Sequence, residues 1–324
     1  MAEWTLSGAL NRALLDAMDE DPRVLVFGED VGRLGGVFRV TDGLQAKFGE
    51  ERVFDTPIAE AGLVGAAIGL ALTGWKSVVE MQFDGFSYPA FEQIVSHLAK
   101  YRSRTRGRVE LPIVIRIPSF GGIRGKEHHG ESPETYFVHT AGLKVVAPSG
   151  ALDGYRLLRL AIADPDPVIV LEPKARYWAK EEGELTIDGP GIGRGRVVRE
   201  GDACVVVAYG AMVARCLEAA ETLETEGISV RVLDLRSLSP LDVDLIARCA
   251  RETGRIVVVH EAPRTLGLGA EIVARIVEEA FDHLEAPVAR VTGWDVPYPP
   301  AALEAAYLPG VDRIAEAVRR VVAY

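Results

Sequence analysis

Residues 55–83 read DTPIAEAGLVGAAIGLALTGWKSVVEMQF and hold, in order, the patterns of a helix and a strand. No residue from Ala61 to Trp75 carries a charge. Because a membrane-spanning helix needs about 20 apolar residues, this shorter stretch predicts a buried helix over residues 60–73. The short segment Ser77–Met81, which holds Val78, Val79 and Met81, then predicts a buried strand. A helix that leads directly into a buried strand is typical of an α/β fold.

The same alternation continues in both directions along the chain and predicts α/β domains throughout. Strands are predicted over residues 23–27, 77–81, 111–117, 144–147, 167–171, 203–208, 229–233, 256–260 and 288–292. Helices are predicted over residues 6–18, 60–73, 89–106, 151–163, 211–226, 241–251, 270–281 and 311–322. The pattern breaks over residues 172–200, where glycine and proline are frequent. We therefore expect two α/β domains with mainly parallel sheets, over residues 1–180 and 201–324, joined by a linker over residues 181–200.

Composition and charge limit the classes of partner. The 324 residues include 36 Lys and Arg against 47 Asp and Glu, for a net charge of −11. Nucleic acid is therefore not expected as a main partner, because phosphate contacts need a basic surface. Residues 201–324 hold 12 arginines, no lysine and 19 acidic residues, so a basic protein could dock there. Three cysteines in all favour a reducing cytoplasm, and neither a secretion signal nor a membrane segment is expected.

Polar residues that follow predicted strands are the first candidates for chemistry, because ligands of α/β sheets collect at the carboxyl ends of the strands. Glu60 follows the short segment 52–54 and opens the apolar helix. It could simply complement the helix dipole, or it could enter a buried place and bind a ring nitrogen strongly. The aromatic run from Phe83 to Tyr88 follows the next strand. Such aromatics serve a core or form a platform for a cofactor.

The loop after the predicted strand 111–117 carries the adjacent histidines His128 and His129 among several glycines. Neighbouring side chains point in different directions, so one histidine at most faces a given site. A zinc site would need a recognisable ligand set, and Glu127 and Glu131 do not complete one. A histidine that moves a proton fits this place better. The sequence contains no G-x-S-x-G, P-loop or C-x-x-C motif, which removes several hydrolase, nucleotidase and redox classes.

Taken together, these stretches resemble one family, the beta subunits of thiamine-diphosphate-dependent 2-oxo acid dehydrogenases. The similarity runs in order along nearly the whole chain. It rests on Gly28-Glu29-Asp30-Val31-Gly32, Asp55-Thr56-Pro57-Ile58-Ala59-Glu60, Glu80-Met81-Gln82-Phe83, His128-His129 to Ser132-Pro133-Glu134, the stretch from His139 to Val146, Leu171-Glu172-Pro173-Lys174, Asp234-Leu235-Arg236 and Pro297-Tyr298-Pro299.

The resemblance implies a pyrimidine-binding domain followed by a transketolase C-terminal-like domain. It also implies a heterotetramer of two alpha and two beta chains that shares thiamine diphosphate between them. Glu60 would bind the aminopyrimidine nitrogen, and Phe86 would stack on that ring. The residues lining this end of the site would be Glu29, Ile58, Ala59, Gln82 and Pro89. His129 would act where the acyl group passes to lipoamide on the acyltransferase core, with Phe83 and Phe86 also facing the substrate.

The same resemblance implies two metal ions. A structural potassium ion would lie at the positions that match Ile113, Ala161, Ile162, Asp164 and Asp166. Magnesium would be held by the alpha subunit, because this chain lacks the Gly-Asp-Gly motif that anchors the diphosphate in such enzymes. The stretch of this chain most similar to that motif is Gly201-Asp202-Ala203, which precedes a predicted strand. A chain with only the pyrimidine half of the site should need an alpha subunit to be active.

Several readings of the function remain open. The His-His-x-Glu-Ser-Pro-Glu pattern looks more like branched-chain enzymes than pyruvate enzymes, but a pyruvate or acetoin dehydrogenase beta subunit is the alternative. Gly130 and Glu131 stand where many relatives have Ser and Gln, and Ala59 where Ser is common, so contacts from those side chains do not carry over. A non-catalytic assembly subunit that docks the acyltransferase core is a reading of another class. A stand-alone transketolase-like enzyme is weakened by the missing diphosphate motif.

Overall fold

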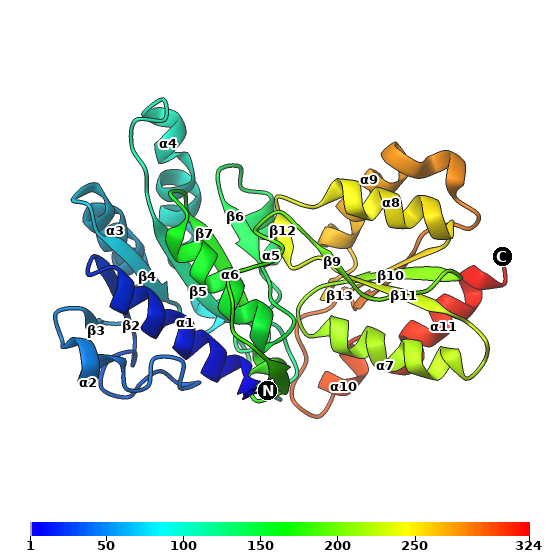
Figure 1. Cartoon of the computed structure of the whole chain (residues 1–324), viewed down its shortest axis with the longest axis horizontal. Helices are drawn as coiled ribbons and strands as arrows, with labels where there is room; N and C mark the ends of the chain where they lie inside the picture. The colour runs from blue at the N-terminus through cyan, green and yellow to red at the C-terminus, as the bar shows by residue number, and fades with distance from the viewer. Residues whose placement is uncertain (1) are drawn as a thin grey trace.

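The computed structural model describes residues 2–324, and these form two α/β domains that lie side by side (Figure 1). The predicted fold class, two α/β domains with mainly parallel sheets, is confirmed. No helix within residues 2–324 is long and apolar enough to cross a membrane.

The sheet of the first domain follows the order β12-β6-β7-β5-β4-β2-β3 and is parallel except where β12 pairs with β6. Its strands are β2 (Val24–Gly28), β3 (Val53–Asp55), β4 (Lys76–Glu80), β5 (Ile113–Ser119), β6 (Lys144–Val146), β7 (Val168–Pro173) and β12 (Ser237–Ser239). The central strands are nearly continuous apolar runs because helices cover both faces of a parallel sheet. A separate ribbon pairs β1 (Ala2–Thr5) with β8 (Lys180–Gly183).

Two long helices cover one face of this sheet. They are α1 (Leu6–Glu20) and α6 (Ala151–Ala163), and they pack closely against each other (Figure 1). Thr5 caps the first of them by accepting a hydrogen bond from the amide of Gly8. The other face carries α3 (Glu60–Leu72) and the segment that leads into α4 (Tyr101–Arg104). Shorter helices are α2 (Leu44–Phe48) and α5 (Glu134–Val138), with 3₁₀ turns at Asp84–Ser87, Leu98–Lys100 and Lys174–Arg176.

The second sheet follows the order β14-β13-β10-β11-β9, and only β9 runs antiparallel to its neighbour among the described strands. Its strands are β9 (Arg196–Arg199), β10 (Cys204–Ala208), β11 (Val230–Asp234), β13 (Ile256–Pro263) and β14 (Ala289–Gly293). Its helices are α7 (Met212–Glu224), α8 (Val243–Thr253), α9 (Leu268–Ala280), α10 (Glu304–Tyr307) and α11 (Val311–Val322), with a 3₁₀ turn at Phe281–His283. Helices α7 and α11 cover one face, and α8 and α9 lie on the other.

Two predictions from the sequence are wrong in detail. The single helix expected over residues 89–106 is a π-helical turn (Gln93–His97), a 3₁₀ turn and the short α4. A change of hydrogen-bond register inside a helical segment is decided by packing. The expected linker holds β8 and β9, because the backbone of its polar residues completes other strands. The domain boundaries at residues 180 and 200 stay a prediction, although β9 before residue 200 belongs to the second sheet.

Candidate active site

The carboxyl ends of β2, β3 and β4 meet at one edge of the first sheet, since these strands are neighbours. Glu29 follows β2 and is buried, and Glu60 is buried in the first turn of α3. Burial raises the pKa of Glu29, and the negative charges of Glu60 and Asp30 raise it further. One carboxyl oxygen of Glu29 is buried without a hydrogen-bond partner. This edge therefore offers an unsatisfied acidic site to a group that can donate hydrogen bonds.

Other predicted lining residues lie around these two carboxyl groups. The side-chain amide of Gln82 donates to Asp30 over 2.8 Å, which leaves the Gln82 carbonyl oxygen for another partner. Ile58 is 83% exposed, and Ala59 and Pro89 are also exposed. This chain alone does not enclose them, as expected for a site that a second chain completes.

An aromatic cluster stands beside the acidic pair and includes one of the two histidines. The ring of His129 lies 4.2 Å from the ring of Phe83 and 5.4 Å from that of Phe86, measured between centroids. The two phenylalanines are 6.0 Å apart and nearly perpendicular. His128 is exposed and does not belong to this cluster. The expectation that only one of the adjacent histidines faces a site agrees with this arrangement.

The hydrogen bonding of His129 defines its tautomer. Its Nδ1 lies 2.9 Å from the carbonyl oxygen of Glu127. A carbonyl can only accept, so Nδ1 carries the hydrogen and donates. In the neutral ring Nε2 is then free to accept a proton, which is the state that a general base requires.

A network of buried ion pairs stabilises this edge of the sheet. Arg116 in β5 donates to both carboxyl oxygens of Glu172 over 2.7 and 2.8 Å and to Glu80 over 2.6 Å. The hydroxyl of Tyr177 also donates to Glu172 over 2.6 Å. Burial raises the pKa of Glu80, and Arg116 partly opposes that shift. This network was not predicted, although a lone arginine inside the apolar strand 113–119 is a visible signal for a buried ion pair.

A second buried ion pair holds the aromatic turn in place. Lys174, just after β7, pairs with Asp84 in the 3₁₀ turn that carries Phe86. Both side chains are fully buried. Burial lowers the pKa of Lys174 and raises that of Asp84, and each partner's charge opposes the other's shift. Lys174 belongs to the family motif Leu171-Glu172-Pro173-Lys174, and nothing in its local sequence pattern predicts this partner.

The residues matched to a potassium site lie together at the opposite edge of the sheet. Ile113, Ala161 and Ile162 are buried there. The carboxylate of Asp164 accepts two hydrogen bonds of 2.7 Å from Lys144 and one of 2.9 Å from the amide of Asp166, and Asp166 pairs with Arg102 over 3.3 Å. The two carboxylates are therefore already neutralised and do not fit the role of free oxygen donors. Within residues 2–324 no group of three or more His, Cys, Asp or Glu side chains is arranged to hold a metal.

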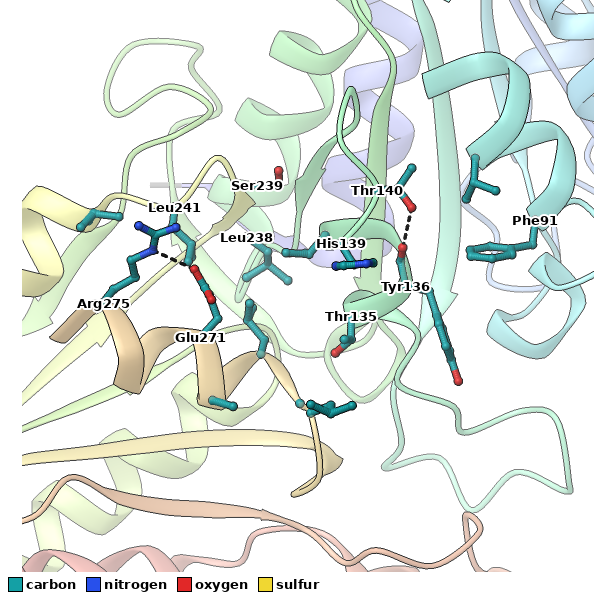
Figure 2. Close-up of a pocket in the computed structure, with 17 residues that line it drawn as sticks. Phe91, Thr135, Tyr136, His139, Thr140, Leu238, Ser239, Leu241, Glu271 and Arg275 are labelled. Atoms are coloured by element: carbon teal, nitrogen blue, oxygen red, sulfur yellow. Dashed lines mark hydrogen bonds and ion pairs between the residues drawn. The ribbon is translucent and has the colours of Figure 1, made fainter. Parts of the chain in front are cut away.

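A groove of about 1080 Å³ opens between α5 of the first domain and α9 of the second (Figure 2). Figure 2 shows Tyr136 and His139 on one side and the bonded pair Glu271 and Arg275 on the other. Its lining contains none of the residues proposed to bind the cofactor, the substrate or potassium. The candidate cofactor-binding and catalytic side chains therefore lie outside the groove.

Comparison with known proteins gives matches along nearly the whole chain. The transketolase pyrimidine-binding domain matches residues 2–179, and the transketolase C-terminal domain matches residues 193–314. The beta subunit of a 3-methyl-2-oxobutanoate dehydrogenase of Mycobacterium tuberculosis (strain CDC 1551 / Oshkosh) is 58% identical over 98% of this chain and 92% of its own length. The beta subunit of a pyruvate dehydrogenase of Leifsonia xyli subsp. xyli is 53% identical over 98% of this chain and 94% of its own.

A solved structure gives the same picture of the fold. A chain described as a split-gene transketolase, in an inactive tetramer of beta chains, superposes with a TM-score of 0.80. It is 28% identical, and the match covers 98% of each chain. The similarity therefore includes both domains and their relative placement.

Proposed function

The chain belongs to the family of 2-oxo acid dehydrogenase beta subunits, with transketolase-type domains, and on that premise we propose that it supplies half of the active site of a branched-chain enzyme. In this proposal the enzyme decarboxylates a branched 2-oxo acid and passes the acyl group to a lipoyl group on the acyltransferase core. The observation that carries the proposal is the buried pair Glu29 and Glu60, placed beside an aromatic and histidine cluster at an open edge.

The family implies thiamine diphosphate, and the residues at this edge fit its pyrimidine end. The orphaned carboxyl oxygen of Glu29 can accept from an amino group, and the buried carboxyl of Glu60 can share a proton with a ring nitrogen. Phe86 offers a half-buried ring for stacking, and Gln82 retains a free acceptor. Ile58, Ala59 and Pro89 would line the same end once a partner covers them. When bound, the cofactor supplies the electron sink for decarboxylation.

His129 would handle a proton during acyl transfer to lipoamide. The bond from Nδ1 to the carbonyl of Glu127 fixes the ring, so that Nε2 is the atom left to accept or return a proton. Phe83 and Phe86 pack against this ring and exclude water from one side of it. Both phenylalanines would also contact the acyl group of the substrate.

The names of the relatives imply an alpha subunit as partner. We propose the heterotetramer of two alpha and two beta chains, with magnesium on the alpha subunit, because the Gly-Asp-Gly motif is missing from this sequence. Potassium at Ile113, Ala161, Ile162, Asp164 and Asp166 would have to rely on main-chain oxygens, since Lys144 holds the carboxylate of Asp164. The cytoplasmic location stays a prediction.

A pyruvate dehydrogenase beta subunit is the second candidate, because relatives with that name reach 53% identity. Rates of the reconstituted tetramer on pyruvate and on 3-methyl-2-oxobutanoate separate the two candidates. We expect the branched substrate to have the higher kcat/KM. The opposite order would assign the chain to the pyruvate enzymes.

The test of the site is Glu60→Gln in the assembled complex. The amide has the same size but no charge, so we expect activity to fall by at least about 100-fold while the tetramer still forms. Glu50→Gln, at an exposed position without an ion pair among the described residues, is the matched control. Full activity of the Glu60 variant would refute its role. A His129→Ala variant that keeps full turnover would favour a non-catalytic assembly subunit instead.

A further inference from the structure

The loop of residues 119–133, here called the histidine loop, is held by carboxylates of the other domain. The amide of Gly121 donates to Glu261 over 2.8 Å. The amides of Gly122 and Arg124 donate to Glu304 over 3.0 to 3.2 Å. Both glutamates are buried. Three backbone amides of the loop that carries His129 thus donate to side chains more than 130 residues away in the sequence.

Tyr298 occupies a notch in the same loop. Its hydroxyl donates to Glu304 over 2.7 Å. A Cβ atom at Gly130 would lie 2.3 Å from the ring of Tyr298, and one at Gly121 would lie 2.1 Å from its hydroxyl oxygen. Such distances are far below van der Waals contact, so a side chain at either loop position would have to displace the ring of Tyr298 from the place it occupies in this chain. Gly130 is directly bonded to His129, and the notch therefore sets where the histidine stands.

The histidine loop does not hold this shape through its own backbone preferences. Phe120, Arg124 and His128 all have positive φ angles, of 71°, 55° and 66°. Residues with side chains avoid this left-handed region unless the surroundings impose it. Among the described residues, internal support of the loop includes bonds from the Phe120 amide to Glu131 and from the His129 amide to Lys126. External contacts must therefore stabilise the rest of the conformation.

The charges around these anchors are mainly negative. Burial raises the pKa of Glu261 to about 7, and the amide of Gly121 and the cation of Lys174 oppose the shift. Glu134 and Glu304 lie close enough to raise it further. The loop amides and Tyr298 donate hydrogen bonds to the two glutamates in this negatively charged region. Burying acidic groups near one another costs free energy, so we expect the contact to serve more than folding.

We propose that Tyr298, Glu304 and Glu261 are positioning residues that fix His129 for the acyl-transfer step. They act through the histidine loop and do not contact the predicted reacting groups. The second domain would thereby control the half-reaction that requires His129, while decarboxylation depends on the first domain's Glu60. This inference rests on the proposed function for its effect on catalysis, but its structural part does not.

The structural part is tested by hydrogen exchange of the assembled complex without substrate. In Glu304→Gln and in Tyr298→Ala we expect the amides of Gly122 and Arg124, which donate to Glu304, to exchange at least about tenfold faster, which is the effect of one lost hydrogen bond. Tyr298→Phe keeps the ring in the notch and should change exchange less than Tyr298→Ala. Glu316→Gln, at an exposed site, is the control. Unchanged exchange in both test variants would overturn the proposal.

The catalytic part is tested by separating the two half-reactions. In Glu304→Gln we expect acyl transfer to the lipoyl group to fall by about 10-fold or more, with the KM for the 2-oxo acid unchanged. Decarboxylation, followed with an artificial electron acceptor, should fall less than about threefold. Combined with His129→Ala, the variant should cause no further loss, because both changes remove the same contribution.

Equal loss in both half-reactions, or losses that add in the double variant, would show a merely structural role and overturn the proposal. The outcome is distinguishable from a failure of the proposed function. If Glu60→Gln stays fully active, the proposed cofactor site is refuted. Faster exchange of the loop amides would still show that the second domain holds the histidine loop in place.

Discussion

Charged side chains are fully buried at several points beneath the site. Arg116 is matched by Glu80 and Glu172, and Lys174 is matched by Asp84. Such pairs contribute little net stability relative to apolar residues, but losing one partner is costly. Their value here is placement, since they fix the ends of β4 and β7 and the turn that carries Phe86.

Lys174→Met tests this view of the buried pair. The substitution leaves the Asp84 carboxylate buried without a cation, so we expect the free energy of unfolding to fall by about 3–5 kcal/mol at neutral pH. The double variant Lys174→Met/Asp84→Asn should recover most of that loss, because no uncompensated charge remains. Denaturant unfolding of each variant measures the effect.

The control for this cycle is Lys180→Met, whose lysine pairs with Glu3 at the surface. Surface pairs are worth little, so a change within about 0.5 kcal/mol is expected. If Lys174→Met were no more harmful than Lys180→Met, the buried pair would not be the support described here.

At this scale the sequence predicted which candidate residues lie near one another better than it predicted the side chains that hold them in place. Glu60 and His129 could be found because they follow strands whose apolar pattern is plain. Their grouping with Glu29 and Phe83 then follows from the order of parallel strands. Glu261 and Glu304 could not be found, because their partners are backbone amides far away in the sequence, and a backbone amide leaves no trace in residue identity.

Helix α3 has an exposed face made of small residues. Ala61, Gly62, Ala66 and Gly69 are exposed on it, and nothing lies within 4 Å of a Cβ atom built at Gly69. Within this chain the glycines therefore weaken the helix without relieving any crowding. These glycines would, however, let the backbone of a neighbouring chain approach helix α3 closely in the complex.

Gly69→Ala should consequently stabilise the isolated chain. Alanine favours a helix over glycine by about 1 kcal/mol, and no steric cost opposes this gain, so the Tm should rise by about 2–4 °C. The reverse change Ala66→Gly, on the same face, should lower the Tm by a similar amount. Thermal unfolding gives both values, and a Tm that falls for Gly69→Ala would contradict this account of the face.

The elements that the sequence did not predict are those that tertiary contacts create. Strand β12 has only three residues, with the serines Ser237 and Ser239 on either side of one leucine, and no alternating apolar pattern. Its backbone pairs with β6 of the other domain, which local propensity cannot reveal. The π-helical turn Gln93–His97 likewise departs from a pattern that reads as one regular helix.

The two domains are joined by a buried polar network as well as by apolar contacts. Arg236 pairs with Asp153 over 2.9 Å, and Asp153 also pairs with Arg196 over 2.9 Å. The hydroxyl of Ser149 donates to Asp234 over 2.6 Å. Burial raises the pKa of Asp234 to about 7, although the Ser149 hydroxyl opposes the shift. Asp153 and Ser149 lie in the first domain, so this titration takes place at the domain junction.

Asp234 therefore makes the stability of the whole molecule depend on pH. The pKa of an aspartate in an unfolded chain is about 4, so the folded protein binds the proton of the Asp234 carboxyl more tightly than the unfolded chain does. The stabilisation is fully present below about pH 4 and is lost as the pH rises through the folded value near 7. Asp234→Asn cannot lose a proton, so its Tm should fall less than that of the wild type between pH 4.5 and 7.5, by roughly 5–10 °C.

Differential scanning fluorimetry across that pH range measures the two profiles. Asp282→Asn, at an exposed position, is the control and should follow the wild-type profile. Parallel profiles for Asp234→Asn and the wild type would exclude Asp234 as a source of the pH dependence.

Strands β9 and β12 are edge strands that lie on opposite sides of residue 200 from the rest of their sheets. β9 ends at Arg199 and completes the sheet of the second domain, while β12 begins at Ser237 and completes that of the first. A gene divided at residue 200 would thus yield two fragments that each lack an edge strand. The exposed edges of β6 and β11 would then be templates for aggregation. We therefore expect a chain divided at residue 200 to refold less well than the intact chain, even though the protein is built from two separate sheets.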